Sequence, residues 1–364
     1  MNVYLRAIGI VVVPFIPTFL SSRSIRYMDT SPKFIVVIGT SAGGLSALRQ
    51  LLGSVSTDGD VVYVVVMHLS GKPATNVLFD GLCTYTALPV KMAEDWMPIQ
   101  RNHIYIAPRN VHLVVKKGYL KLGYGPKENR WRPSIDVLFR SAAVAYDTHA
   151  IGIVLTGMLN DGVTGLKTIQ HCGGTTIVQD PNEASFPDMP RNVLEQMEVD
   201  YTVPISAMND IIQKVIHQDI ASMTPPENLR LEAEISEKTV IGDEIVPILG
   251  KQTTLACPDC GGSLWELKND NITHYRCHIG HAYGEQDLLL KQSEKLESAL
   301  WIAVRITEER RNMLTKLREK AVSRGFVKSA ASYEENAAEL ESTIETLRQL
   351  LYQIEKRESD ADND

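Results

Sequence analysis

A serine between two glycines follows the first apolar run of the chain and could serve as a nucleophile. Residues 39–43 read Gly-Thr-Ser-Ala-Gly and end an apolar, β-branched stretch that begins at Phe34. They match the pattern Gly-x-Ser-x-Gly, in which the glycines permit a sharp strand-to-helix turn that exposes the serine hydroxyl. The N-terminus of the helix that follows can help to stabilise an oxyanion. The pattern by itself fits an unspecialised glycine-rich turn equally well.

Two nucleotide-binding patterns compete for the same loop. A dinucleotide fingerprint needs glycine where Ser41 stands, because a side chain there hinders close approach of the backbone to a pyrophosphate. A Walker A loop ends in Gly-Lys-Ser/Thr, and this loop does not. A nucleotide-binding protein is therefore the least favoured of the hypotheses for this loop.

A serine hydroxyl also needs a general base and a group that orients the base. His68 ends the apolar run 61–68, and Asp161 follows the run 150–157 in a glycine-rich loop. Functional side chains gather at the carboxyl ends of parallel strands, so Ser41, His68 and Asp161 are predicted to meet as a catalytic triad. Taken singly, His68 could be a hydrogen-bonded strand cap and Asp161 the N-cap of the next helix. The order Ser–His–Asp differs from the Ser–Asp–His order of α/β-hydrolases, which disfavours a standard member of that fold.

Alternating apolar runs and helical patterns must position these residues. Strands are predicted at 34–39, 61–68, 103–108, 150–157 and 175–180. Helices are predicted at 45–53, 134–146, 162–172 and 190–197. The alternation indicates an α/β fold with a doubly wound, mostly parallel sheet. Residues 111–124 predict a β-hairpin around a Lys-Gly turn that decorates this sheet.

Five blocks of this region resemble, in order and spacing, the catalytic domain of bacterial chemotaxis protein-glutamate methylesterases, the CheB family. The resemblance covers about residues 34 to 220, and its blocks are VVIGTSAGGLSALRQLL, VVMHLS, IYIAPRNVHL, RPSIDVLFRSAA and GIVLTGMLNDGVTGLKTIQHCGGTTIVQDPNEASFPDMPRNVL. The family's serine, histidine and aspartate fall on Ser41, His68 and Asp161. The family's methionine falls on Met158, whose backbone N–H the resemblance implies as an oxyanion donor.

Residues beside the nucleophile complete the implied oxyanion site. Thr40 and Ala42 flank Ser41, and backbone N–H groups of residues 40–43 are expected to join that of Met158. Family members often carry threonine where this chain has Ala42, so a hydroxyl contribution at that position is lost here.

The resemblance implies acyl transfer on a protein substrate. Ser41 would attack the γ-methyl ester of a glutamate on a methyl-accepting chemotaxis receptor, and water would then free the glutamate. Deamidation of receptor glutamines is the same chemistry with ammonia leaving. No cofactor is expected for catalysis, and contact with the membrane is expected only indirectly, through the receptor. The alternative is a non-catalytic adaptor on the same fold that binds a receptor or a kinase.

A second group of residues could hold a metal. Two cysteines of a Cys-x-x-Cys pair precede a third cysteine and a histidine, and the four are Cys257, Cys260, Cys277 and His281. Such pairs on tight turns are typical of a zinc ribbon, and four ligands without an open position predict a closed structural site. His278 and His274 are the alternatives for the fourth ligand. Short strands around Leu264 and Tyr275 are expected between the ligand pairs.

The remaining segments complete the predicted organisation. Residues 1–29 form an N-terminal extension, and a mis-assigned start is one interpretation of it. Residues 30–220 form the catalytic domain, 221–253 a linker, 254–284 the zinc-ribbon-like module, 285–358 a helical hairpin and 359–364 a disordered tail. Family members carry an N-terminal receiver domain, for which residues 1–33 are too few, so regulation is expected elsewhere. The hairpin could be a plain packing or dimerisation element, or it could bind a methyltransferase, a kinase or a response regulator.

Charge and cysteine usage limit the remaining function classes. The net charge is −7 and no strongly basic segment stands out, which argues against nucleic-acid binding. Five cysteines, an odd number that includes a Cys-x-x-Cys pair, fit a metal in a reducing compartment better than a disulfide framework. A cytoplasmic location is expected.

Apolar residues at helical spacing are expected to pack the two helices of the hairpin against each other. They are Leu290, Leu296, Leu300, Ile302, Val304 and Ile306 in the first helix and Leu340, Ile344, Leu347 and Leu351 in the second.

Overall fold

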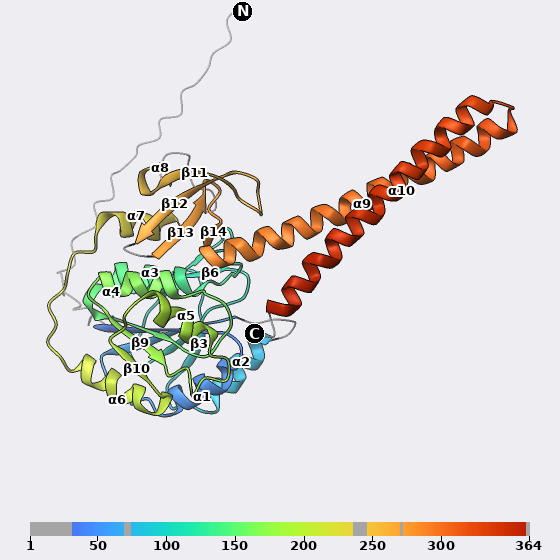
Figure 1. Ribbon diagram of the computed structural model, residues 1–364. Coiled ribbons are helices and arrows are strands. Elements are labelled where there is room, and N and C mark those ends of the chain that lie inside the picture. Colours follow the sequence, from blue (N-terminus) through green and yellow to red (C-terminus); the bar gives the residue numbers. More distant parts are fainter. Residues whose placement is uncertain (1–30, 69–73, 236–245, 270–271, 362–364) are drawn as a thin grey trace, which may run out of the picture. The chain divides into compact units, whose positions relative to one another are not determined.

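The computed structural model describes residues 31–68, 74–235, 246–269 and 272–361 (Figure 1). The predicted N-terminal extension, residues 1–29, lies outside the described residues.

A parallel sheet forms the centre of the larger part of the chain. Its seven strands run in the order β10-β9-β8-β1-β2-β5-β3, and every neighbouring pair is parallel. The strands are β1 (Phe34–Thr40), β2 (Val61–Met67), β3 (Val90–Met92), β5 (Ile104–Ile106), β8 (Ala150–Val154), β9 (Thr175–Gln179) and β10 (Tyr201–Val203). The predicted α/β class with a mostly parallel sheet is confirmed. β3 (Val-Lys-Met) and β10 (Tyr-Thr-Val) were not predicted, because each is short and contains a polar residue, so neither forms a continuous apolar run.

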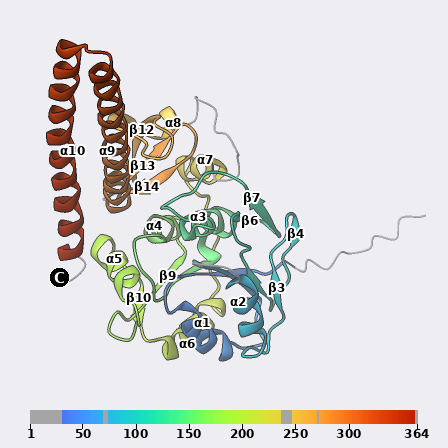
Figure 2. The same ribbon diagram turned by 90° about the vertical axis from the view of Figure 1, so that its right-hand side faces the viewer.

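Helices cover both faces of this sheet (Figure 1, Figure 2). They are α1 (Gly44–Gly53), α2 (Ala74–Cys83), α3 (Ile135–Tyr146), α4 (Val163–His171), α5 (Asp188–Gln196) and α6 (Ile205–Ile216). Ile35 and Val37 of β1 pack in one core with α3, α4 and α5. Val36 and Ile38 pack in the other core with α1, α2 and α6. Since successive strand residues point to opposite faces and both faces are covered, β1 is apolar throughout.

The predicted hairpin lies beside this sheet. β6 (His112–Lys116) and β7 (Tyr119–Gly123) pair in antiparallel fashion, and β4 (Met97–Pro98) adds a third strand to β7. The turn uses Gly118, whose φ of 84° is a left-handed conformation that favours glycine.

A smaller antiparallel sheet follows in the chain. Its order is β11-β12-β13-β14, with β11 (Lys251–Ala256), β12 (Ser263–Asn269), β13 (Ile272–Cys277) and β14 (Ala282–Gly284). Two helices, α7 (Glu227–Ile235) and α8 (Val246–Leu249), precede it inside the segment expected to be a linker. Leu229 of α7 is buried in the core that contains α3, so this part of the predicted linker is packed structure.

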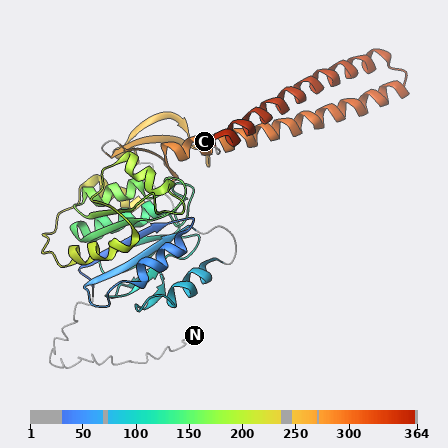
Figure 3. The same ribbon diagram turned by 60° about the horizontal axis from the view of Figure 1, so that its bottom comes forward.

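Two long helices, α9 (Glu285–Ser323) and α10 (Val327–Ala361), form the predicted helical hairpin. They run side by side (Figure 2, Figure 3). The chain reverses at Gly325, whose φ is 76°. α10 extends past the predicted end of the hairpin at residue 358. No helix among the described residues is both long enough and apolar enough to cross a membrane.

The expected seam between the two helices is partly wrong. Val304, Ile344 and Leu351 are buried as predicted. Several other predicted residues remain exposed, namely Leu290, Leu296, Ile302 and Ile306. Two antiparallel helices bury only a narrow stripe of each other, so apolar residues on the flanks of that stripe stay open to solvent.

Candidate active site

Ser41 lies on the turn between β1 and α1. Gly43 takes a left-handed φ of 76°, and the Gly44 N–H donates to the Ser41 carbonyl at 3.0 Å, which closes the turn. The neighbouring loop comes very close, because a Cβ on Gly157 would lie 2.8 Å from the Ser41 Cβ. Glycine at position 157 therefore lets the β8 loop pack against the serine. The predicted strand–turn–helix context of Ser41 is present.

His68 follows β2, the strand next to β1. Its backbone N–H donates to the Thr40 carbonyl at 3.0 Å, which places it beside the serine turn. Its Nε2 lies 2.9 Å from Asp161 Oδ2, and both side chains are buried. Since an ionised carboxylate only accepts, Nε2 carries the proton and Nδ1 is the nitrogen left to act as a base. Among the described residues Nδ1 has no hydrogen-bond partner.

Asp161 is held by a dense set of donors. Besides His68, its carboxylate accepts hydrogen bonds from Asn129 Nδ2 (3.1 Å), Ser134 Oγ (2.8 Å), Ile135 N (2.6 Å) and Asp136 N (3.2 Å). Asp161 thus sits at the N-terminus of α3, where free N–H groups and the helix dipole favour a negative charge. The alternative role as N-cap of α4 is not observed, because Gly162 occupies that position. These contacts fix the carboxylate that holds His68.

The three expected oxyanion residues differ in whether their N–H groups are already bonded. Among the described residues no acceptor is bonded to the N–H of Ala42 or of Met158. Thr40 differs: its backbone pairs with Met67 of β2, and its hydroxyl donates to the Thr156 carbonyl at 2.8 Å. Because Thr40 is fully buried and already bonded, the expected contribution of Thr40 to an oxyanion site disagrees with the structure. The Ser41 N–H also donates to the Thr156 carbonyl, at 3.1 Å, and is therefore already bonded.

A pocket of about 280 Å³ opens beside His68. Its apolar lining includes Met67, Ala107 and Trp131. Four basic side chains also line it, namely Arg109, Lys127, Arg130 and Arg132, and no acidic side chain does among the described residues. A pocket of this charge is complementary to an acidic ligand.

Sequence patterns did not predict two residues that contact the proposed triad. The Trp131 ring stacks on the His68 ring with centroids 4.1 Å apart and planes 6° from parallel. Asn129 donates to Asp161, as described above. Both precede the block RPSIDVLFRSAA in a polar loop without periodicity, so no local signal marks them.

The predicted metal ligands lie together. The ligand atoms of Cys257, Cys260, Cys277 and His281 are all within 4.8 Å of one another. His274, an alternative fourth ligand, instead bonds Glu232 at 2.9 Å. A hydrogen bond from Cys277, together with His281 and Tyr283, outweighs burial and lowers the pKa of the Cys257 thiol to about 3. Cys257 thus favours the thiolate, which is the form that binds metal. The pKa of the Cys260 thiol is instead raised by burial, and that of Cys277 by its hydrogen bond to Cys257 and by burial.

Comparison with known proteins shows similarity over the region of the parallel sheet. Residues 36–212 match the family model described as CheB methylesterase. A Leptospira interrogans protein named as a protein-glutamate methylesterase/protein-glutamine glutaminase is 35% identical over 179 residues, which are 48% of this chain and 91% of that protein. A Rhizobium johnstonii protein with the same activity in its name is 34% identical over 186 residues, 50% of each chain.

A solved structure is also similar. It is described as the crystal structure of the Thermotoga maritima CheB methylesterase catalytic domain, with 33% sequence identity and a TM-score of 0.47. The match covers 50% of this chain and 97% of that one. The family-model match, residues 36–212, leaves out the Cys/His cluster and the helical hairpin.

Proposed function

Because this chain belongs to the CheB methylesterase family, we propose that it hydrolyses γ-methyl esters of glutamate on a methyl-accepting chemotaxis receptor. The relatives' names support an enzyme over the non-catalytic adaptor. They also pair the esterase with a glutaminase, and we extend the proposal to deamidation of receptor glutamines. Since the substrate is the cytoplasmic region of such a receptor, the proposed location is the cytoplasm.

The proposed mechanism assigns one task to each residue. Ser41 Oγ attacks the ester carbonyl carbon while His68 Nδ1 takes the hydroxyl proton. Asp161 holds His68 through Nε2 and stabilises the imidazolium. The backbone N–H groups of Ala42 and Met158 bind the oxyanion. His68 returns the proton to departing methanol, and water then attacks the acyl-enzyme by the same steps, which frees the glutamate.

One observation carries this proposal. The His68–Asp161 hydrogen bond is buried, anchored at the N-terminus of α3, and lies beside the turn that presents Ser41. Ser41 Oγ has no hydrogen bond to His68 among the described residues, as is common for catalytic contacts that tighten only with substrate bound. The basic side chains around the neighbouring pocket suit a substrate rich in glutamate.

The test is methanol release from a methylated chemoreceptor fragment. Ser41→Ala should lower the rate on the order of 10⁴-fold or more, because the nucleophile is lost. Ser54→Ala, at the other end of α1, is the matched control and should keep the parent rate. Parent-like release by Ser41→Ala would refute the assignment. No release by the parent, together with no labelling of Ser41 by a fluorophosphonate, would favour the adaptor.

We further propose that the four-residue Cys/His cluster holds a structural zinc ion. Three thiols and one imidazole with ligand atoms within 4.8 Å of one another match the ligand types and number of a closed zinc site. The ion would tie the loop that carries Cys257 and Cys260 to the end of β13. No catalytic step involves it.

A further inference from the structure

The segment between the β-hairpin and α3 forms a wall of the candidate active site. We call residues 126–134 the active-site wall. His112 joins its two ends, because Nε2–H donates to the Pro126 carbonyl at 2.7 Å and Nδ1 accepts the Ser134 N–H at 3.3 Å. Burial lowers the pKa of His112, which suits the neutral ring that these two contacts require.

One side of the active-site wall contacts the proposed triad. Asn129 Nδ2 donates to Asp161 Oδ1 at 3.1 Å and to Asp136 Oδ2 at 2.6 Å. Trp131 stacks on His68. Asn129 does not line the pocket beside His68, so its contacts act through Asp161 rather than on a ligand there.

The other side contacts the Cys/His module, which we define as residues 251–284. The Asn129 N–H donates to the Ala282 carbonyl at 2.8 Å, and the Gly284 N–H donates to Asn129 Oδ1 at 3.0 Å. Two nitrogens of Arg276 contact the Glu128 carboxylate at 3.0 and 2.9 Å. Arg276 immediately precedes Cys277, one of the clustered cysteines.

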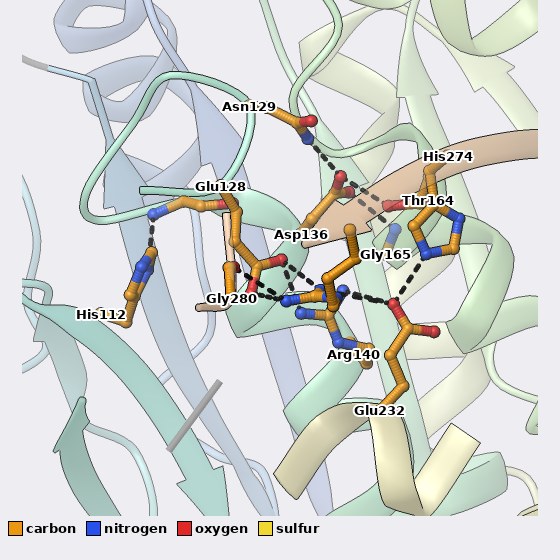
Figure 4. Close-up of polar contacts among 12 residues, drawn as sticks. His112, Glu128, Asn129, Asp136, Arg140, Thr164, Gly165, Glu232, His274 and Gly280 are labelled. Atoms are coloured by element: carbon orange, nitrogen blue, oxygen red, sulfur yellow. Dashed lines mark hydrogen bonds and ion pairs between the residues drawn. The ribbon is translucent and has the colours of Figure 1, made fainter. Parts of the chain in front are cut away.

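These ion pairs are buried. Figure 4 shows Glu128 next to Arg140, which in turn lies near Glu232 and His274. Burial raises the pKa of Glu128, but the charges of Arg140 and Arg276 outweigh it and hold the pKa well below the usual range. A buried and fully bonded carboxylate resists movement, since breaking one pair leaves a charge without compensation. The module therefore holds the active-site wall at Glu128 and Asn129.

The contact from Gly284 decides which way the Asn129 amide points. Its N–H needs an acceptor, so it selects Oδ1, and Nδ2 must then face the two carboxylates. A flipped amide would place Oδ1 against the Asp161 and Asp136 oxygens and leave the half-buried Gly284 N–H unpaired. Both changes are unfavourable.

We propose that the Cys/His module is a working part of the esterase site, with Asn129 and Trp131 as positioning residues for Asp161 and His68. Gly284 holds Asn129. Arg276 holds Glu128, whose backbone exchanges two hydrogen bonds with that of Trp131, at 3.2 and 2.9 Å. This inference rests on the proposed function for its catalytic consequence. On this inference the module contributes to the rate of catalysis and does not only fold around the Cys/His cluster.

The decisive variant is Gly284→Pro in the full chain. Proline removes the N–H donor, and the φ of −65° at position 284 is the value that proline adopts. Gly284→Ala keeps the donor, and its Cβ would meet no atom closer than 3.9 Å. We expect kcat for methanol release to fall about three- to tenfold in Gly284→Pro, with KM nearly unchanged. Gly284→Ala should keep the kcat of the parent.

A second variant keeps the proposal testable if Gly284→Pro fails to fold. Asn129→Ala removes the donor to Asp161 and should lower kcat about tenfold to a hundredfold, again with little change in KM. Metal content and melting temperature identify folded variants. A folded Gly284→Pro or Asn129→Ala protein with the parent kcat would overturn the proposal.

A readout that needs no turnover separates this inference from the proposed function. The proton on His68 Nε2, bonded to Asp161, gives an NMR signal that we expect to shift or broaden in Gly284→Pro and Asn129→Ala, but not in Gly284→Ala. If the parent releases no methanol, the proposed substrate is wrong, and the NMR signal alone then tests whether the module positions Asp161 and His68. An unchanged signal in both variants would then overturn the inference.

Discussion

The two nitrogens of His68 have different surroundings, and this difference defines the chemistry at the scale of single residues. Nε2 is bonded to Asp161, while Nδ1 has no partner among the described residues. A buried polar nitrogen without a partner is costly in a folded protein unless a ligand or a reaction uses it. This asymmetry fits a base that awaits the proton of Ser41.

Charge reversal on the pocket rim tests the preference for an acidic substrate. Lys127 is exposed and lines the pocket beside His68. Lys127→Glu should raise KM for an acidic receptor fragment about two- to fivefold and leave kcat nearly unchanged, because an exposed charge acts on binding. Lys214→Glu on α6, which packs on the opposite face of the sheet, is the control. Steady-state kinetics at low and high salt would check this, and equal KM values for the two variants would contradict it.

At the scale of elements, the Cys/His module combines a metal-ligand cluster with contacts to the active-site wall. β12 and β13 pair from Leu264 with Cys277 to Asn269 with Ile272, which brings distant ligand pairs together. β14 then leads directly into α9. The module therefore connects the cluster, the active-site wall and the helical hairpin along one short stretch of chain.

Metal analysis tests the cluster. Native mass spectrometry should find about one zinc ion per chain, held by four ligands. His281→Ala should lower the zinc content and the melting temperature, because His281 belongs to the cluster. His278→Ala is the matched control and should retain the ion. Loss of zinc in His278→Ala but not in His281→Ala would show that the fourth ligand is wrongly assigned.

At the scale of the whole molecule, three carboxylates from distant parts of the sequence gather beneath the active site. Asp136, Asp161 and Asp287 are all buried, and the charge of Asp161 raises the pKa of both neighbours. Asp287 is in the first turn of α9, where a carboxylate often accepts the N-cap N–H. Here the Gly284 N–H is bonded to Asn129, and Asp287 has no hydrogen-bond partner among the described residues.

This arrangement predicts a pH-dependent stability. Burial first, and then the charge of Asp161, raises the pKa of Asp287 from 3.8 to about 7. Below about pH 4 the group is protonated in both the folded and the unfolded protein, and it costs nothing. As pH rises towards 7 the unfolded carboxyl ionises first, so the free energy of unfolding falls. Asp287→Asn should thus stabilise the protein on the order of a few kcal/mol at pH 8, with no gain near pH 4.

Chemical denaturation at pH 4 and at pH 8 would measure this difference. Asp136, whose pKa is also raised to about 7, mainly by burial, is present in both proteins, so the comparison measures the loss of the Asp287 carboxyl together with its interaction with Asp136. Glu285→Gln, an exposed carboxyl in the same helical turn, is the control and should change little at either pH. A gain in Asp287→Asn that is equal at both values of pH would contradict the prediction.

The sequence by itself determined the features that depend on short patterns. Short, β-branched apolar runs predicted β1, β2, β5, β8 and β9, and strand ends then singled out Ser41, His68 and Asp161. The Cys-x-x-Cys spacing marked the cysteine cluster in the same way. These features are local because strand periodicity, turn glycines and ligand spacing all act over a few residues.

Only the tertiary structure decided which surfaces meet. Asp161 could cap α4 by sequence, yet packing brings it to the N-terminus of α3, 25 residues or more earlier in the chain. Glu128 and Arg276 pair across 148 residues, a contact that neither local segment reveals. Likewise, helical periodicity in α9 showed apolar residues but could not show that Leu296 and Ile302 stay exposed. A periodic pattern states which side of an element is apolar, while burial depends on the shape and position of the partner that covers it.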